Sequence, residues 1–448
     1  MGGFTIFTLL KQGLVAAFLT IALIAPGLSR AQGLIRDAEI ERTLDLIARP
    51  ILQAAGLNPG SVNVLILNSQ RMNAFVAGGN NIFVHTGLLQ RLKTIDQVRS
   101  VLAHEAGHIT GGHLARRNEN LRSAKGAAGL GLLIAIASIA AGGRSVAFPI
   151  ASLTQEAALR NFLSHTRAEE ASADQAGLRY MIGAGADPRA IMEVMDLFAG
   201  QQILSSSSAD PYTLTHPLWS ERLRYLEDKI ASAPIGKGPS QTEVYWHARM
   251  VAKFEGFIDN PQRVIRKYRN DKTEIGSLAR AVAYHRLPNI KQSMREIDGL
   301  IKLRPNDPFY RELKGQFLLE GGDVNGAIQY YRQAVKLAPT EALILAGLGR
   351  SLVAADVAAA NTEAISVLEK ANARDPAIAA VFRDLATAYA RSGQLGRASL
   401  ATAERFALEG RFRDAQIHAN RAIKQLPEGS AGWRQARDIL SVANRTLK

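Results

Sequence analysis

The residues best suited to chemistry are His104, Glu105 and His108, which form an H-E-x-x-H motif. In a helix, residues four apart lie about 40° apart around the axis, so both imidazoles face the same side. Two such imidazoles can bind one metal ion, and Glu105 beside them can take a proton from water on that metal. A motif this short also arises by chance in roughly one chain in a hundred of this length, so its surroundings must decide.

An acidic stretch further along the chain offers the third ligand that a hydrolytic zinc site needs. Glu170 and Asp174 are four residues apart and share one face of a predicted helix. We expect Glu170 to bind the metal and Asp174 to accept a hydrogen bond from a ligand imidazole, which fixes its tautomer. Glu169 points about 100° away and is expected to face solvent. Without the upstream motif, this stretch would be interpreted as an ordinary charged helix face.

His113 lies close to the motif in the sequence but is not expected to share its metal. It follows His104 by nine residues, which places it on the opposite side of a straight helix. We therefore expect a hydrogen-bonded structural role for His113.

The elements that must position these residues indicate a mostly helical α+β domain with a small sheet. Apolar residues at helical spacing predict a helix over 34–55. Strand-like runs occur at 62–67, 74–76 and 82–84, the last two flanking the turn residues 78–81. The motif helix is expected to begin near Thr94, where Thr94 and Gln97 can form a capping box, and to end near Arg117.

The C-terminal half carries helical repeats. A frame of 34 residues starting at Pro308 places small, aromatic and proline residues where tetratricopeptide repeats have them, at Gly315, Ala327, Tyr331, Ala334 and Pro339. A second frame from Ala342 repeats the pattern once a short insertion near Ala360 is allowed. We expect an α+β domain with the metal site over 32–235, followed by an all-α tetratricopeptide solenoid over 240–448, with the boundary in 234–240.

These motifs together resemble a known family. His104 to His108 followed by Glu170-x-x-Ala173-Asp174 is similar to the zinc endopeptidases that include the CAAX prenyl proteases and the heat-shock protease HtpX. The likeness is strongest to their exported branch with a C-terminal tetratricopeptide domain, and it covers nearly the whole mature chain. The resemblance implies a zincin-type fold and one Zn²⁺ per chain. It assigns the zinc ligands to His104, His108 and Glu170, and the general base to Glu105.

The resemblance also implies a role for His216 in the segment Thr215-His216-Pro217. His216 can occupy the fourth zinc position and hold the enzyme latent, since a neutral imidazole competes well for zinc. A histidine beside proline in a loop is otherwise usually a surface residue. The residue that assists the oxyanion is not identifiable from the sequence, and Arg222 is one candidate.

The N-terminus has the features of an export signal. Lys11 precedes an uncharged run from Gln12 to Ser29, and Ser29-Arg30-Ala31 offers a signal peptidase site. We expect residues 1–31 to be a cleaved signal and the mature chain to reside in the periplasm; an uncleaved membrane anchor is the alternative. The chain has no cysteine, which excludes disulfides and thiolate metal ligands and is compatible with an oxidising compartment.

Charge and hydropathy limit the partners. The net charge is +14, but the basic residues are dispersed without a long run, so no nucleic-acid role is expected. Residues 126–143 are uncharged and formally long enough to span a membrane. A single crossing there would place Glu170 on the opposite side from His104. We therefore expect a segment near the active site that contacts a client or makes a peripheral contact with a membrane.

Two functions of different classes remain. The first is a zinc endopeptidase that hydrolyses misfolded or stalled outer-membrane proteins, with the repeats binding clients or the outer-membrane protein assembly machinery. The second is a non-proteolytic periplasmic chaperone or scaffold for the same assembly. The intact Glu105 favours the first, because a purely structural site needs no base. The strand around 73–76 could hold an extended substrate by edge pairing.

Overall fold

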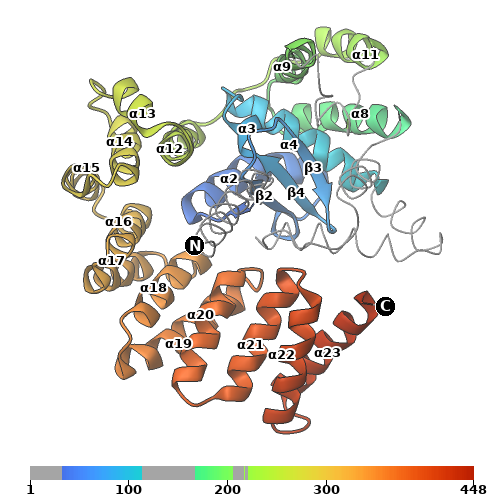
Figure 1. Ribbon diagram of the computed structural model, residues 1–448. Coiled ribbons are helices and arrows are strands. Elements are labelled where there is room, and N and C mark those ends of the chain that lie inside the picture. Colours follow the sequence, from blue (N-terminus) through green and yellow to red (C-terminus); the bar gives the residue numbers. More distant parts are fainter. Residues whose placement is uncertain (1–32, 114–166, 205–215, 217–219, 448) are drawn as a thin grey trace, which may run out of the picture. The chain divides into compact units, whose positions relative to one another are not determined.

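The computed structural model describes residues 33–113, 167–204, 216 and 220–447 (Figure 1). The expected export signal and the uncharged run 126–143 lie outside the described residues. Residues Gly33–Lys448 form one compact unit. Among the described residues, no helix is both long enough and apolar enough to cross a membrane.

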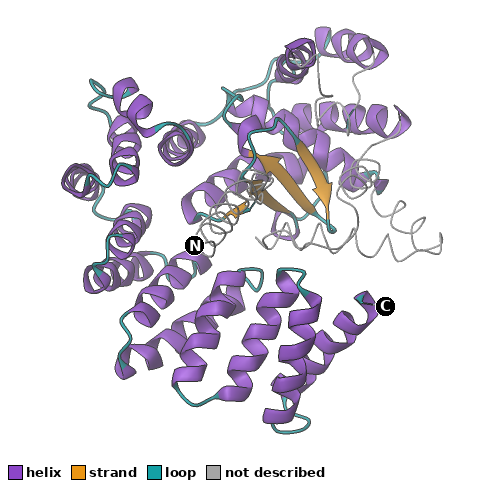
Figure 2. Cartoon of the chain, in the orientation of Figure 1, coloured by secondary structure: helices purple, strands orange, loops and turns teal. Residues whose placement is uncertain are grey.

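A small mixed sheet forms the first part of the described chain (Figure 2). Its strands are β1 (Leu34–Ile35), β2 (Asn63–Leu67), β3 (Ala74–Ala77) and β4 (Asn81–His85), arranged in the order β1-β2-β4-β3. β2 and β4 run parallel, whereas β1 and β3 pair antiparallel to them at the two edges. Gly78 and Gly79 make the β3–β4 turn with φ of 60° and 93°, values that favour glycine. The predicted strands 62–67, 74–76 and 82–84 are thus confirmed.

The first helix starts later than the sequence pattern indicated. α2 spans Ala38–Ala54, and Asp37 caps it by accepting hydrogen bonds from two backbone amides of its first turn. Leu34 and Ile35 instead pair with β2. The prediction of a helix from residue 34 was wrong because the helical spacing of apolar residues runs on through this strand.

The motif lies on α4, which spans Ile95–Thr110. The predicted capping box of Thr94 and Gln97 is present. The predicted end near Arg117 was wrong, since the helix stops at Thr110 and Gly112 follows with a φ of 63°. The remaining helices of this part are η1 (Pro59–Ser61), α3 (Thr86–Leu89), α8 (Arg167–Gly183), α9 (Ala190–Leu204) and α11 (Ser220–Ala231).

Beyond residue 240 the described chain consists of helices that pack on their neighbours, which confirms the predicted repeat solenoid. The helices are α12 (Gln241–Ile258), α13 (Pro261–Lys267), α14 (Glu274–Arg286), α15 (Ile290–Leu303), α16 (Pro308–Glu320), α17 (Val324–Leu337), α18 (Ala342–Ala354), α19 (Ala358–Arg374), α20 (Ala379–Arg391), α21 (Leu395–Leu408), α22 (Phe412–Gln425) and α23 (Ala431–Thr446). Repeat glycines permit close packing. A Cβ on Gly315 would lie 2.7 Å from the Tyr331 ring.

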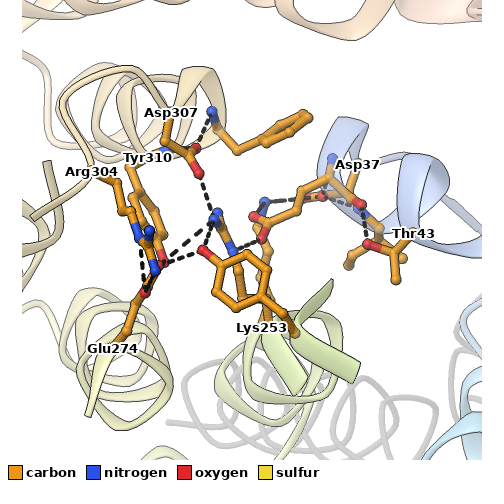
Figure 3. A network of polar contacts seen from close by, with 12 residues as sticks. Asp37, Thr43, Lys253, Glu274, Arg304, Asp307 and Tyr310 are labelled. Carbon is orange, nitrogen blue, oxygen red and sulfur yellow. Dashed lines mark hydrogen bonds and ion pairs between the residues drawn. The ribbon is translucent and has the colours of Figure 1, made fainter. Parts of the chain in front are cut away.

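Buried charges join the repeats to the sheet-containing part (Figure 3). Arg249 and Lys253 of α12 are fully buried. Arg249 lies 2.5 Å from Glu39 of α2 and 2.5 Å from Asp307, the residue that caps α16. Lys253 lies 2.8 Å from Asp37, the cap of α2. The positive ends of the helix dipoles of α2 and α16 therefore add to the stabilisation of these carboxylates.

A further acid completes this arrangement. Glu274, in the first turn of α14, accepts hydrogen bonds from the hydroxyls of Tyr245 (2.6 Å) and Tyr310 (2.7 Å) and from Arg304 (3.0 Å). We refer to Asp37, Glu39, Arg249, Lys253, Glu274 and Asp307 as the junction network. Because α2 also packs on α4 and α8, this network ties the repeat helices to the elements that carry the motif. No helix or strand lies between α11 and α12, where the domain boundary is predicted.

Candidate metal centre

Small residues allow α4 and α8 to approach closely. A Cβ on Gly107, inside the motif, would lie 2.8 Å from the backbone oxygen of Ala173 on α8. A Cβ on Gly177 would lie 3.2 Å from the backbone nitrogen of His104. Sequence reasoning missed these positions, although Ala173 and Gly177 share the helix face of Glu170 and are recognisable as a small-residue stripe. This crossing brings Glu170 and Asp174 to the histidines.

Four side chains from three segments converge at this crossing. Ligand atoms of His104, His108, Glu170 and His216 all lie within 4.8 Å of one another, and all four residues are buried. The Nε2 atoms of His104 and His108 are 3.1 Å apart, and Glu170 Oε1 is 3.3 Å from His108 Nε2. We call these four residues the metal cluster.

The donor chemistry of the metal cluster fits a metal ion. Asp174 Oδ1 lies 3.0 Å from His104 Nδ1, so the ring proton belongs on Nδ1 and the Nε2 lone pair points at His108. Burial lowers the pKa of His108 well below its ordinary value, which keeps this ring neutral. The Nε2 atoms of the two rings face each other at 3.1 Å, close enough for both to bind one zinc ion at the Zn–N distance of roughly 2.0–2.1 Å. Imidazole nitrogens and a carboxylate are ligands that zinc accepts.

His113 supports the metal cluster from outside it. Its Nδ1 lies 2.8 Å from Nδ1 of His108, which leaves Nε2 of His108 directed at His104. The sequence argument placed His113 on the far side of a straight helix. The helix ends at Thr110, and the turn through Gly112 brings His113 back toward the motif. Its hydrogen bond with a predicted ligand orients that ligand.

Arg222 of α11 binds both acids of α8. Its Nε and Nη2 lie 2.6 and 2.8 Å from the Asp174 carboxylate, and its Nη1 lies 2.7 Å from Glu170. Burial would raise the pKa of Asp174, but hydrogen bonds from His104 and Arg222 outweigh it and lower that pKa. The guanidinium is thus engaged by two carboxylates, and this geometry does not support the oxyanion role considered for it.

Glu105 is buried beside the metal cluster, and the hydrogen-bonding capacity of its carboxylate is largely unused. Neither carboxylate oxygen has a close hydrogen-bond partner among the described residues, and His216 Nε2 lies 3.6 Å from Glu105 Oε1. Burial raises the pKa of Glu105 to about 8, and the charge of Glu170 makes a smaller contribution in the same direction. His104 and the Val76 backbone act in the opposite direction and lower this pKa. A divalent cation nearby would favour the charged carboxylate and lower this pKa.

His216 lies inside the metal cluster and is fully buried. Its Nδ1 is 2.9 Å from Glu170 Oε1 and 3.3 Å from His104 Nε2. Burial would raise the pKa of Glu170, but His216, His108 and His104 together lower it well below its ordinary value. Glu169, by contrast, is partly exposed and is not a member of the cluster.

Comparisons with known proteins agree with this arrangement. Residues 35–230 match the family described as Peptidase family M48. The Escherichia coli K12 protein named beta-barrel assembly-enhancing protease is 30% identical over 195 residues, which are 42% of this chain and 39% of that protein. A Vibrio cholerae relative, named putative beta-barrel assembly-enhancing protease, is 26% identical over 62% of this chain and 58% of its own length. The match therefore spans about two fifths to three fifths of the length of these two relatives.

A solved structure of a thermophilic tetratricopeptide repeat protein from Thermus thermophilus covers 39% of this chain and 99% of its own. It is 20% identical, with a TM-score of 0.28. The family match, in contrast, takes in the sheet, α4, α8 and α11, and hence all the residues of the metal cluster. Residues 35–230 of this chain are therefore similar to the peptidase domains of family M48.

Proposed function

We propose that this protein is a zinc-dependent endopeptidase that hydrolyses misfolded or stalled outer-membrane proteins in the periplasm. The observation that carries the proposal is the convergence of His104, His108 and Glu170 with an unpartnered Glu105 beside them. Relatives named beta-barrel assembly-enhancing protease support the client class. The export signal expected in residues 1–31 supports the location.

The residues of the peptidase domain would have different roles in catalysis. His104, His108 and Glu170 would hold one zinc ion per chain. When bound, zinc supplies a Lewis acid that polarises the scissile carbonyl and makes water more acidic. Glu105 would take the proton of the attacking water and pass it to the leaving amine. Asp174 and His113 would hold the two imidazoles in their ligating orientation.

An extended substrate has a place to bind beside Glu105. In the described part of the chain β3 is an edge strand of the sheet, and the Val76 backbone faces the Glu105 carboxylate. Pairing along β3 would hold a peptide through its main chain and require no particular side chains. This suits a peptidase that acts on unfolded segments of many clients. The repeats, over residues 240–448, would bind clients or the outer-membrane assembly machinery.

We also propose that His216 keeps the enzyme inactive by occupying the fourth zinc position, a role that we call the latch. Its buried position against Glu170 and His104 is where a fourth zinc ligand would lie. A fourth protein ligand leaves no open position for catalysis, so His216 must leave before substrate can react. This gives an enzyme that is inactive at rest and is opened by a client.

Digestion of fluorescent casein by the wild type, Glu105→Gln and His216→Ala tests the proposal, with bound zinc measured for each. We expect Glu105→Gln to retain zinc and lose activity by about 10²–10⁴-fold, the usual effect of removing a general base. We expect His216→Ala to retain zinc and digest casein faster than the wild type. His418→Ala, on α22 of the repeats, is the matched control and should behave as the wild type.

Two results would contradict the proposal in different ways. Full activity of Glu105→Gln would remove the general base and with it the mechanism. Zinc-loaded wild type and His216→Ala that both leave casein intact would favour the alternative, a non-proteolytic chaperone or scaffold. Unchanged or lower activity of His216→Ala with zinc retained would overturn the latch alone.

A further inference from the structure

Arg222 is a buried arginine beside the metal cluster, and the residue roles proposed above do not include it. Its side chain is 4% exposed and lies in the first turn of α11. The same face of this helix buries Leu226 and Ile230, four and eight residues further on, in an apolar cluster with Leu178 of α8. This packing holds the backbone of Arg222 beside α8.

The guanidinium of Arg222 contacts two acids through three different nitrogens. Nε and Nη2 lie 2.6 and 2.8 Å from the two oxygens of Asp174, a paired contact that fixes the plane of the guanidinium. The third nitrogen, Nη1, lies 2.7 Å from Oε2 of Glu170. Asp174 Oδ1 also lies 3.0 Å from Nδ1 of His104. Arg222 is therefore connected to two predicted zinc ligands, to Glu170 directly and to His104 through its carboxylate partner.

The two carboxylate oxygens of Glu170 face different groups. Oε1 lies 3.3 Å from Nε2 of His108 and 2.9 Å from Nδ1 of His216. Oε2 lies 2.7 Å from Arg222 and 3.6 Å from Nε2 of His104. Two ligand atoms of one tetrahedral zinc ion are roughly 3.3 Å apart, since each lies about 2 Å from the metal. Oε1 has this spacing to His108, whereas Oε2 is held by the guanidinium.

We propose that Arg222 is a positioning residue that holds Oε2 of Glu170, so that Oε1 alone is directed at the metal. A carboxylate has two oxygens, and binding through both would fill a further position around the ion. Catalysis needs one position open for water or substrate. Arg222 keeps that position available once His216 has left. The inference rests on the proposed zinc site and adds the residue that orients its carboxylate ligand.

The alternative is that Arg222 acts through its charge alone. A positive charge beside the cluster repels a divalent cation wherever its nitrogens point. Two substitutions separate these roles. Arg222→Gln removes both the charge and the fork of donors, whereas Arg222→Lys keeps the charge and replaces the planar fork by a single ammonium group. Arg222→Lys still offers both acids a positive charge, so it should fold even if Arg222→Gln does not, and it then decides alone.

Zinc affinity, measured by competition with a zinc indicator, separates the two roles. If Arg222 positions Glu170, both variants should bind zinc about 10–100-fold more weakly, the usual cost of losing such a support. If only its charge acts, Arg222→Gln would bind zinc more tightly and Arg222→Lys would bind it as the wild type does. Either of these results would overturn the proposal. Arg224→Gln removes the same charge from an exposed position on α11 and should leave the affinity unchanged.

Cobalt in place of zinc gives a spectroscopic readout of the same role. Four-coordinate Co²⁺ absorbs visible light more strongly than five-coordinate Co²⁺, so the spectrum reports whether Glu170 binds through one oxygen or both. We expect strong bands in the wild type and Arg224→Gln, and weaker bands in fully loaded Arg222→Lys. An unchanged spectrum in Arg222→Lys would contradict the role of Arg222 and leave the metal centre intact. A wild type that binds neither metal would overturn the zinc site and, with it, this role.

Discussion

The metal cluster and the junction network are both buried collections of ionisable groups, but their charges are balanced differently. In the junction network, Arg249 and Lys253 lie within 3.3 Å of carboxylates, and those carboxylates lie at helix N-termini. In the metal cluster, imidazole nitrogens face each other and a carboxylate, and Glu105 beside them has no close hydrogen-bond partner among the described residues. The chain pairs the buried charges of the junction network, whereas at the metal cluster Arg222 pairs with Glu170 and Asp174 and Glu105 is left without such a partner.

This difference separates stability from chemistry. A buried network of paired charges is costly to disrupt, because removing one partner leaves another charge buried and unpaired. An unsaturated cluster destabilises the free chain but binds what completes it. Mutations in the junction network should therefore act on folding, and mutations in the metal cluster on metal binding and turnover.

The largest effect on stability should come from Arg249→Met. The variant keeps the length of the side chain but leaves Glu39 and Asp307 without their shared guanidinium. We expect the free energy of unfolding to fall by about 3–5 kcal/mol, as for a broken buried ion pair. Denaturant unfolding of the variant and of Arg266→Met, an exposed control on α13, measures this. A loss below about 1 kcal/mol would show that the network is not a stabilising junction.

A smaller effect, on zinc affinity, is expected for Asp174, which orients the predicted ligand His104. Asp174→Asn weakens the hydrogen bond to Nδ1 of His104 and one of the two attachments of Arg222. We expect zinc affinity to fall by about 10–100-fold, the usual result of losing such a support. Competition with a zinc indicator measures the affinity. Asp228→Asn, an exposed carboxylate on α11, should leave it unchanged. Unaltered affinity in Asp174→Asn would count against the assigned role of Asp174.

His85, at the end of β4, extends the comparison because it is buried and no acid among the described residues forms an ion pair with it. Burial, with a smaller effect of Arg71, lowers its pKa to about 4, from 6.5. The unfolded chain therefore binds the proton more readily, and the stability that neutral His85 provides is lost as the pH falls from 6.5 toward 4. Between pH 7 and pH 5 the wild type should lose about 2 kcal/mol more unfolding free energy than His85→Gln. Equal losses in denaturant unfolding at the two pH values would contradict this.

The sequence predicts those parts of the site that depend on local spacing. The pairing of His104 with His108 and of Glu170 with Asp174, and the capping box of Thr94, follow from helical geometry alone. The start of α2 and the end of α4 do not, because Leu34 is placed by its partner strand and residue 111 onward by a glycine turn. Contacts between residues far apart in the chain could likewise not be predicted from the sequence.

Arg222 and the junction network show the limit most clearly. Arg222 reaches Asp174 across 48 residues of the sequence, and Arg249 reaches Glu39 across 210 residues. A single sequence offers no signal for such pairs. The small residues Ala173 and Gly177 on α8 are different, because their spacing on one helix face can be read from the sequence. Only the helix that packs against them, α4, could not be predicted.

Zinc content of Glu170→Gln tests most directly whether two histidines of α4 and a carboxylate of α8 form one metal centre. The wild type and Glu169→Gln, the control on the same helix, should each bind one zinc ion per chain after dialysis against trace zinc. Glu170→Gln keeps the size of the side chain, so it should fold as the wild type does by circular dichroism and yet retain no zinc. One zinc ion per chain in Glu170→Gln, or none in the wild type, would contradict the account.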